Sequence, residues 1–159
     1  MIDVSNYQRE RADAERFYSQ IGKVLCPVFN ALVYFTSEGF NHLIYKSNRT
    51  ERERSVQMMK FRLLPRVKKL LEICTIYQEY EEGLQEFQVK RHKTRVIETK
   101  VVRYWGIIAI LEGMNFKVIV RQVGDNGQKH FWSVIPDWIT NQYRDLKLIS
   151  LMKGDPKDA

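Results

Sequence analysis

The sequence VVRYWGIIAILEGMNFKVIVRQVGDNGQKHFWSVI, residues 101–135, largely determines which fold this chain can adopt. It contains three apolar runs rich in β-branched and aromatic residues, at 101–111, 116–123 and 129–135. Runs of this kind predict β-strands. The segments between them carry the Gly, Asn and Asp residues that favour tight turns. Since such short connections join antiparallel neighbours, the stretch predicts an antiparallel sheet.

The register of the last predicted hairpin decides which polar side chains share a face of the sheet. With a loop of five residues, 124–128, Ile119 lies opposite Ser133 and Arg121 shares the face of Ile119. With a loop one residue shorter, Arg121 lies opposite His130 and Ser133 lies on the other face. The sequence leaves both registers open.

Helical patterns dominate the residues before this sheet. Apolar residues recur at helical spacing in 14–25 and again in 56–74, and the pair Thr50 and Glu53 matches a capping box for the second helix. Pro65 lies inside that pattern and predicts a kink or two abutting helices. Residues 29–36 predict a strand and 38–45 a short helix.

These elements together predict an α+β fold. N-terminal helices would pack on a three- to four-stranded antiparallel sheet, with a C-terminal helix at residues 137–148. We expect a helical arm at 1–27, one main domain at 28–150 and a disordered tail at 151–159. A further strand is expected at 75–80. The basic segment 85–100 is either a mobile loop or a long β-hairpin with solvated arms.

The composition favours a binding partner that is a polyanion. The formal net charge is +7 and the isoelectric point is about 9.4, which makes nucleic acid the first candidate. Cys26 and Cys74 lie in apolar contexts typical of buried free thiols, which indicates a reducing compartment. No metal-ligand spacing, secretory signal or membrane-spanning run is evident, so we expect a cytoplasmic protein without a metal or cofactor.

His42 is the candidate general acid or base, because it is a lone histidine followed closely by cations. Arg54 and Arg62 lie about two helical turns apart and could hold a phosphate. Arg121 and Ser133 would join them from the sheet. The structural alternatives are a half-buried histidine and a solvated charged face. The candidate RNA-binding residues are Lys46, Arg52, Arg91, Lys93 and His130.

Several runs together resemble a known family: residues 35–46, Arg52 and Arg54, residues 62–65, 117–121 and 131–136. They look like the phage and mobile-element branch of the barnase–EndoU–colicin–RelE (BECR) superfamily. That resemblance implies helices ahead of a four-stranded antiparallel sheet and a metal-independent ribonuclease, often a toxin. It also implies that His42, Arg54, Arg62, Arg121 and Ser133 form the catalytic site.

We therefore expect a toxin-like endoribonuclease that cleaves tRNA or mRNA by attack of a 2′-OH on the adjacent phosphate. Its partner would be an acidic antitoxin or immunity protein that covers the basic face. One alternative is a non-catalytic nucleic-acid-binding or regulatory protein, with Tyr104, Trp105 and Trp132 stacking on bases rather than packing in the core. Another is a protein-interaction subunit that docks through the first helix.

Overall fold

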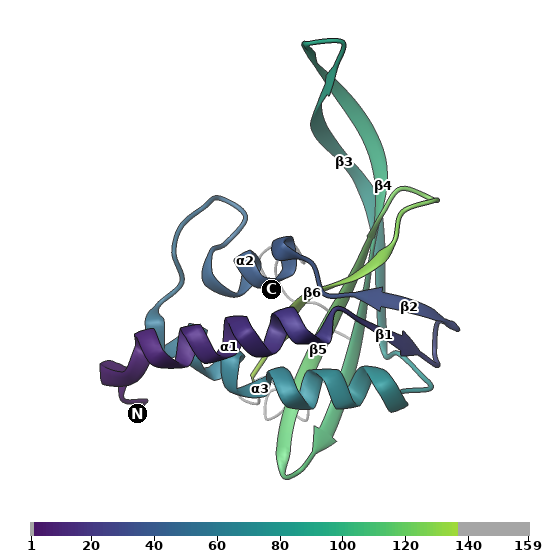
Figure 1. Cartoon of the computed structure of the whole chain (residues 1–159). Coiled ribbons are helices and arrows are strands. Elements are labelled where there is room, and N and C mark those ends of the chain that lie inside the picture. Colours follow the sequence, from purple (N-terminus) through teal and green to yellow (C-terminus); the bar gives the residue numbers. More distant parts are fainter. Residues whose placement is uncertain (1, 137–159) are drawn as a thin grey trace, which may run out of the picture.

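A computed structural model describes residues 2–136, in which six strands form one mixed sheet (Figure 1). The strands are β1 (Lys23–Cys26), β2 (Ala31–Tyr34), β3 (Glu79–Arg91), β4 (Thr94–Leu111), β5 (Met114–Val123) and β6 (Lys129–Ile135). They lie in the order β1-β2-β6-β5-β4-β3, and only β2 and β6 run parallel. The meander from β3 to β6 thus forms most of the sheet.

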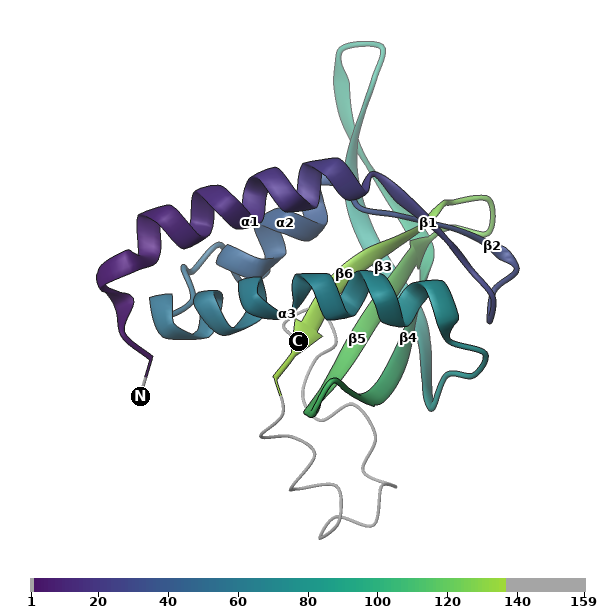
Figure 2. The same cartoon turned by 60° about the horizontal axis from the view of Figure 1, so that its bottom comes forward.

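Helices cover one face of the sheet. They are α1 (Tyr7–Ile21), preceded by a 3₁₀ turn at Val4–Asn6, then α2 (Ser37–Ile44) and α3 (Arg54–Ile73). Figures 1 and 2 both show α1 and α3 side by side over the sheet. Leu64, Val67 and Leu71 of α3 are fully buried there, at the spacings of three and four residues that define one helix face.

The predicted fold class is wrong, because the sheet is larger and mixed. Strands β1 and β2 precede α2 and α3, so the helices are not gathered at the N-terminus. The first helix ends at Gly22, whose φ of 65° is unfavourable for other residues. Residues that continued the apolar helical spacing instead form β1, a strand of four residues. The predicted helix at 137–148 and tail at 151–159 lie outside the described residues.

Helix α3 differs from its prediction at its start and its middle. It begins at Arg54, and Glu53 at the N-cap makes no side-chain capping bond, so the Thr50 and Glu53 capping box is not formed. The backbone N–H of Thr50 instead binds Oδ1 of Asn48, at 3.0 Å. Pro65 lies inside one continuous helix rather than between two. Its solvent-exposed position keeps the ring out of the core.

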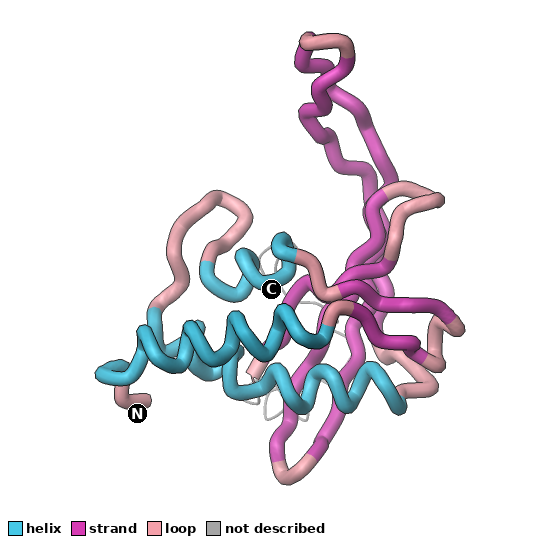
Figure 3. The backbone as a smooth tube through the Cα atoms, in the orientation of Figure 1, coloured by secondary structure: helices cyan, strands magenta, loops and turns pink. Residues whose placement is uncertain are grey.

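The basic segment 85–100 is a β-hairpin, which settles the two alternatives left by the sequence. It forms the outer part of β3 and β4, which extend well beyond the rest of the sheet (Figures 1 and 3). The predicted strand at 75–80 starts later, because β3 begins at Glu79. The three later strands agree with their predicted positions to within a few residues, apart from this extension of β4.

Helix α2 lies unusually close to β6. A Cβ atom at Gly39 would clash with the hydroxyl of Tyr18 and with the carbonyl oxygen of Phe131. Phe131 in turn stacks on Phe35, with ring centroids 5.2 Å apart. Glycine is therefore needed at position 39 for this approach. The approach brings α2, including His42, next to Trp132 of β6.

The two cysteines are buried and unbridged, as predicted. Cys26 ends β1 and Cys74 follows α3, and their Sγ atoms are 3.3 Å apart. Their proximity could not be read from the sequence, because it follows from the packing of α3 on β1.

Candidate functional site

The candidate site forms around Trp132, which lies at a β-bulge in β6. Arg121 pairs with His130, but Ile119 pairs with Ser133, so β6 contains one extra residue between these pairs. The two registers left open by the sequence therefore both occur, one on each side of the bulge. A bulge of this kind re-aims a side chain locally, here the indole of Trp132.

Two nitrogen-rich side chains pack on the Trp132 indole. The His42 ring from α2 stacks on it at a centroid distance of 4.2 Å and an interplanar angle of 22°. The Arg121 guanidinium from β5 lies 4.2 Å from the indole centroid, a cation–π distance. Arg121 also approaches the carboxylate of Glu38, at 4.0 Å. An imidazole and a guanidinium from distant parts of the chain thus meet at one indole.

Arg52 fixes the orientation of the His42 ring. Its Nη2 lies 3.2 Å from Nε2 of His42, and its Nε donates to the His42 carbonyl oxygen at 3.0 Å. A guanidinium has no acceptor, so Nε2 of His42 must accept this bond. The imidazole is then neutral in this arrangement, with its proton on Nδ1.

A short loop after α2 forms the rim of the site. A bridge between Tyr45 and Glu51 closes the loop, and within it Arg49 N–H donates to the Lys46 carbonyl at 2.8 Å. Arg49 has a φ of 66°, a left-handed conformation that costs free energy for a residue with a side chain. Strain of this type occurs preferentially where a loop presents a functional side chain.

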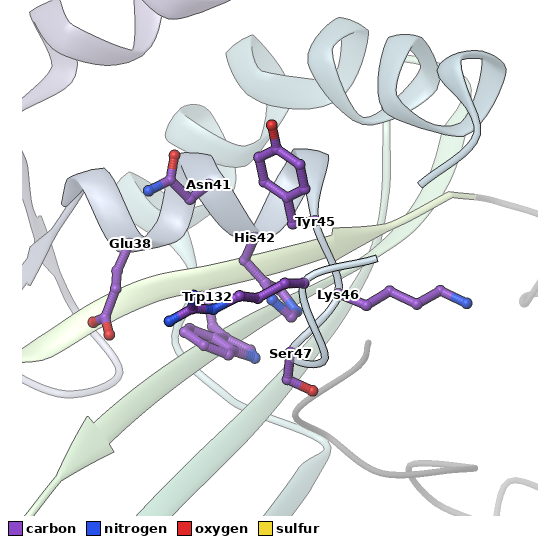
Figure 4. A pocket seen from close by; sticks show the side chains of 8 residues that line it. Glu38, Asn41, His42, Tyr45, Lys46, Ser47 and Trp132 are labelled. Carbon is purple, nitrogen blue, oxygen red and sulfur yellow. The ribbon is translucent and has the colours of Figure 1, made fainter. Parts of the chain in front are cut away.

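The loop, α2 and Trp132 line a solvent-open cavity of about 540 Å³. Figure 4 shows the His42 ring beside Trp132, with Glu38 and Ser47 on opposite sides of the indole. The residues that line the cavity are Glu38, Asn41, His42, Tyr45, Lys46, Ser47, Arg49 and Trp132. Two of them are cationic and one is anionic, so the cavity favours an anionic ligand.

His130 and Ser133 lie near Trp132 but have different surroundings. The His130 ring centroid is 6.1 Å from the Trp132 ring. Burial lowers the pKa of His130, and the positive charge of Arg121 lowers it further. Ser133 is fully buried, and its Oγ accepts a bond from Nζ of Lys60 at 3.2 Å.

Lys60 is a residue that the sequence analysis missed. Its Nζ also donates to the Val134 carbonyl, at 2.7 Å. Burial lowers its pKa well below the usual value, and the charge of Arg52 adds to this effect. Lys60 lies on the same helix face as Leu64, Val67 and Leu71, and this spacing was the available signal. The ammonium or amine group thereby ties α3 to the strand that carries Trp132.

Arg54 and Arg62 do not meet His42. Arg62 makes a two-pronged ion pair with Glu10 of α1, at 2.8 and 2.9 Å, and lines a different cavity. The Arg54 guanidinium lies 4.4 Å above the ring of Tyr7. Both therefore serve the contact between α1 and α3 in this structure.

The remaining predicted RNA-binding residues divide between the site and the hairpin. Lys46 belongs to the loop described above and Arg52 directly follows that loop, whereas Arg91 and Lys93 lie at the far end of β3 and β4. The structure thus brings His42, Arg52, Arg121 and His130 around Trp132, with Lys46 at the rim and Ser133 next in the strand.

Comparison of the chain with protein-family models, curated protein sequences and solved structures found no match. Within residues 2–136, no group of three or more His, Cys, Asp or Glu side chains is placed to hold a metal ion. In the same part of the chain, no helix combines the length and the apolarity needed to cross a bilayer.

Proposed function

We propose that this protein is an endoribonuclease that cleaves RNA in the cavity beside Trp132, without a metal. The observation that supports this most directly is the contact of His42 with both Trp132 and Arg52, beside the cationic rim of Lys46 and Arg49. A group able to transfer a proton and several cations to stabilise a phosphate are the parts this reaction needs. The resemblance to BECR ribonucleases points to the same chemistry.

The geometry suggests how His42 would become a base. An RNA phosphate offers Nη2 of Arg52 an anionic acceptor, which is a stronger partner than imidazole. Transfer of that bond to the phosphate releases Nε2 of His42, which then takes the proton of the 2′-OH. The 2′ oxygen forms a bond to phosphorus while the bond from phosphorus to the 5′ oxygen breaks. The imidazolium returns the proton to the 5′ oxygen, and the products are a 2′,3′-cyclic phosphate and a 5′-OH.

Lys46 and Arg49 would bind the phosphate as it gains charge, and Arg121 would hold the indole that supports His42. We assign no direct role to Arg54 or Arg62, since Tyr7 and Glu10 occupy them. An acidic inhibitor protein that covers Lys46 and Arg49 would be the complementary partner. Activity on tRNA or mRNA would place the protein in the cytoplasm.

The test is cleavage of total tRNA in EDTA by wild-type protein, His42→Asn and Arg62→Gln. We expect the His42 variant to lose about 10²-fold or more of the activity and the Arg62 variant to retain it. Cyclic phosphate ends should be found on the product. Circular dichroism and urea unfolding are used to check that the His42 variant is folded. Absence of cleavage by the wild type, or equal cleavage by His42→Asn, overturns the proposal.

The second candidate function is nucleic-acid binding without cleavage, and the basic hairpin of β3 and β4 favours it. This function predicts RNA binding that weakens steeply with salt, with no strand scission by any variant.

A further inference from the structure

The outer part of β3 and β4 is a two-stranded ribbon that extends away from the body of the protein (Figures 1 and 3). We call it the arm, residues 84–101. Leu84 pairs with Val101 and Arg91 with Thr94, whereas β5 pairs with β4 only from Val102 onward. Eight residue pairs at about 3.3 Å each give the arm a reach of about 26 Å.

Isolated two-stranded ribbons are marginally stable in water, and this arm buries little. Leu84 is 72% exposed and Ile97 65% exposed. Because the arm buries so little apolar surface, it contributes little to the stability of the fold. Another role must explain why the chain contains so long a hairpin. Its location and charge point to a ligand.

The turn at the tip of the arm contains cationic residues in place of the residues that would make the turn most stable. His92 and Lys93 form the two-residue turn with φ values of 49° and 68°. Asn-Gly is the preferred sequence for such a turn, because both residues need positive φ. The neighbouring Lys90 and Arg95 are exposed and lie opposite each other, and among residues 2–136 neither they nor Lys93 have an ion pair. The tip thus presents cations in a conformation that costs free energy.

The arm lacks the aromatic surface that single strands need. Its only Phe, Tyr or Trp ring is Phe87, which is partly buried, with Lys100 at 6.0 Å and Arg121 at 5.9 Å from the ring centroid; the one other ring is the imidazole of His92 in the turn. Proteins that hold single strands stack bases on exposed rings, whereas a double helix presents mainly its phosphates. The arm therefore suits a double-helical ligand. Arg121 contacts both Phe87 and Trp132, so the base of the arm is continuous with the candidate site.

We propose that the arm docks a double-helical segment of the RNA through its phosphates, while an adjoining unpaired nucleotide enters the cavity beside Trp132. The substrate class is then a stem with an unpaired neighbour rather than an unstructured strand. The identity of the ligand as RNA rests on the proposed function. The docking role of the arm rests on its geometry and charge.

The decisive variant replaces His92-Lys93 by Asn-Gly. It relieves the strained turn, so amide hydrogen exchange in the arm should become slower. It also removes Lys93, so the affinity for a stem-loop RNA should fall about fivefold near 0.1 M salt, with a salt slope shallower by about 0.7–0.9. A merely structural arm would bind as well or better once it is better formed. Lys68→Gln on α3 is the control, because it removes one exposed cation elsewhere.

Binding is measured by fluorescence anisotropy in the His42→Asn background, so that the probe stays intact. The probes are a stem-loop RNA, its loop as a single strand, and a DNA stem-loop of the same sequence. A loss with the stem-loops that the single strand does not share supports the proposal, since the proposed contacts are to the phosphates of a double helix. An unchanged affinity, or an equal loss with the single strand, overturns it, and tighter binding of the DNA stem-loop overturns the assignment to RNA.

Failure of the arm and failure of the proposed function have different signatures. If no RNA is cleaved but Asn-Gly still weakens stem-loop binding, the nuclease proposal falls and the arm remains a docking element. If the wild type cleaves RNA and the Asn-Gly variant binds and cleaves the stem-loop equally well, the arm proposal falls alone.

Discussion

Lys117 and Glu79 form a buried ion pair in the body of the sheet, and its removal gives a strong test of the structure. Their side chains are 2% and 1% exposed, and Nζ of Lys117 lies 3.2 Å from Oε2 of Glu79. Glu79 is the first residue of β3 and Lys117 belongs to β5, so the pair spans β4. Gly106, opposite Glu79 in β4, has no side chain to stand between them.

Lys117→Met leaves the Glu79 carboxylate buried without its ammonium partner. We expect a loss of about 3–5 kcal/mol in the free energy of unfolding, which lowers the melting temperature by roughly 6–20 °C. Glu79→Leu should cost a similar amount for the reciprocal reason. The double variant removes both charges, so it should recover most of the loss and give a coupling energy of about 2 kcal/mol or more.

Urea unfolding of the wild type, both single variants and the double variant completes this cycle. Coupling near zero, with losses that simply add, would refute the reasoning that the two charges depend on each other. A loss below about 1 kcal/mol for Lys117→Met would show that the carboxylate is not desolvated.

Three further predictions concern stability alone. Burial holds the pKa of His130 below 6.5, so the unfolded state binds the proton first as pH falls, and the free energy of unfolding should drop below about pH 6.5. His130→Gln should flatten the dependence of the urea midpoint on pH between 7 and 5. Equal slopes for the wild type and the variant would contradict this. Arg62→Ala should cost only about 0–1 kcal/mol in urea unfolding, since its pair with Glu10 is solvent-exposed, and a larger loss would show that the pair carries more than its exposure allows. Pro65→Ala should raise the melting temperature through a gain of about 1–3 kcal/mol, because it restores a donor for the Phe61 carbonyl within the helix, and no gain would mean that the helix already accommodates the ring.

The sequence predicted the elements that have local signals. Apolar runs rich in β-branched and aromatic residues, separated by strong turns, indicated β5 and β6, and helical spacing indicated the buried face of α3. Strand β2 lies within the strand predicted at 29–36, whereas β1 was missed because it contains only four residues and continues the helical spacing of the segment before it. The parallel pairing of β2 with β6 joins residues about a hundred positions apart, such as Val33 and Lys129, and no local pattern records it.

Residues of the candidate site could be predicted only where the type of side chain by itself suggests a role. His42 and Arg121 were singled out as a proton-transfer group and a cation that needs a partner, and both contact Trp132. Arg54 and Arg62 were grouped with them because helical spacing predicts which residues share one side of a helix. It does not predict which other element packs against that side. Here the neighbour is α1, with Glu10 and Tyr7.

Gly39 is the residue on which the whole arrangement depends, because it lets α2 approach β6. The bulge turns Trp132 toward His42 only if α2 lies close to Phe131, and a Cβ atom at position 39 would clash with the Phe131 carbonyl and the Tyr18 hydroxyl. Tyr18 donates a hydrogen bond to the Thr36 carbonyl at 2.6 Å, so its hydroxyl cannot move without loss. Gly39→Ala must therefore shift α2 outward.

We expect Gly39→Ala to cost about 1–3 kcal/mol of stability, as overpacking does, and to abolish RNA cleavage under conditions where the variant is still folded. Gly83→Ala is the matched control, since a Cβ there meets no atom within 4 Å; it should leave activity unchanged. Activity should thus fall far more than the folded fraction, because the displaced helix separates His42 from Trp132. A Gly39→Ala protein that stays folded and retains full cleavage would show that the His42 and Trp132 contact is not needed for the reaction.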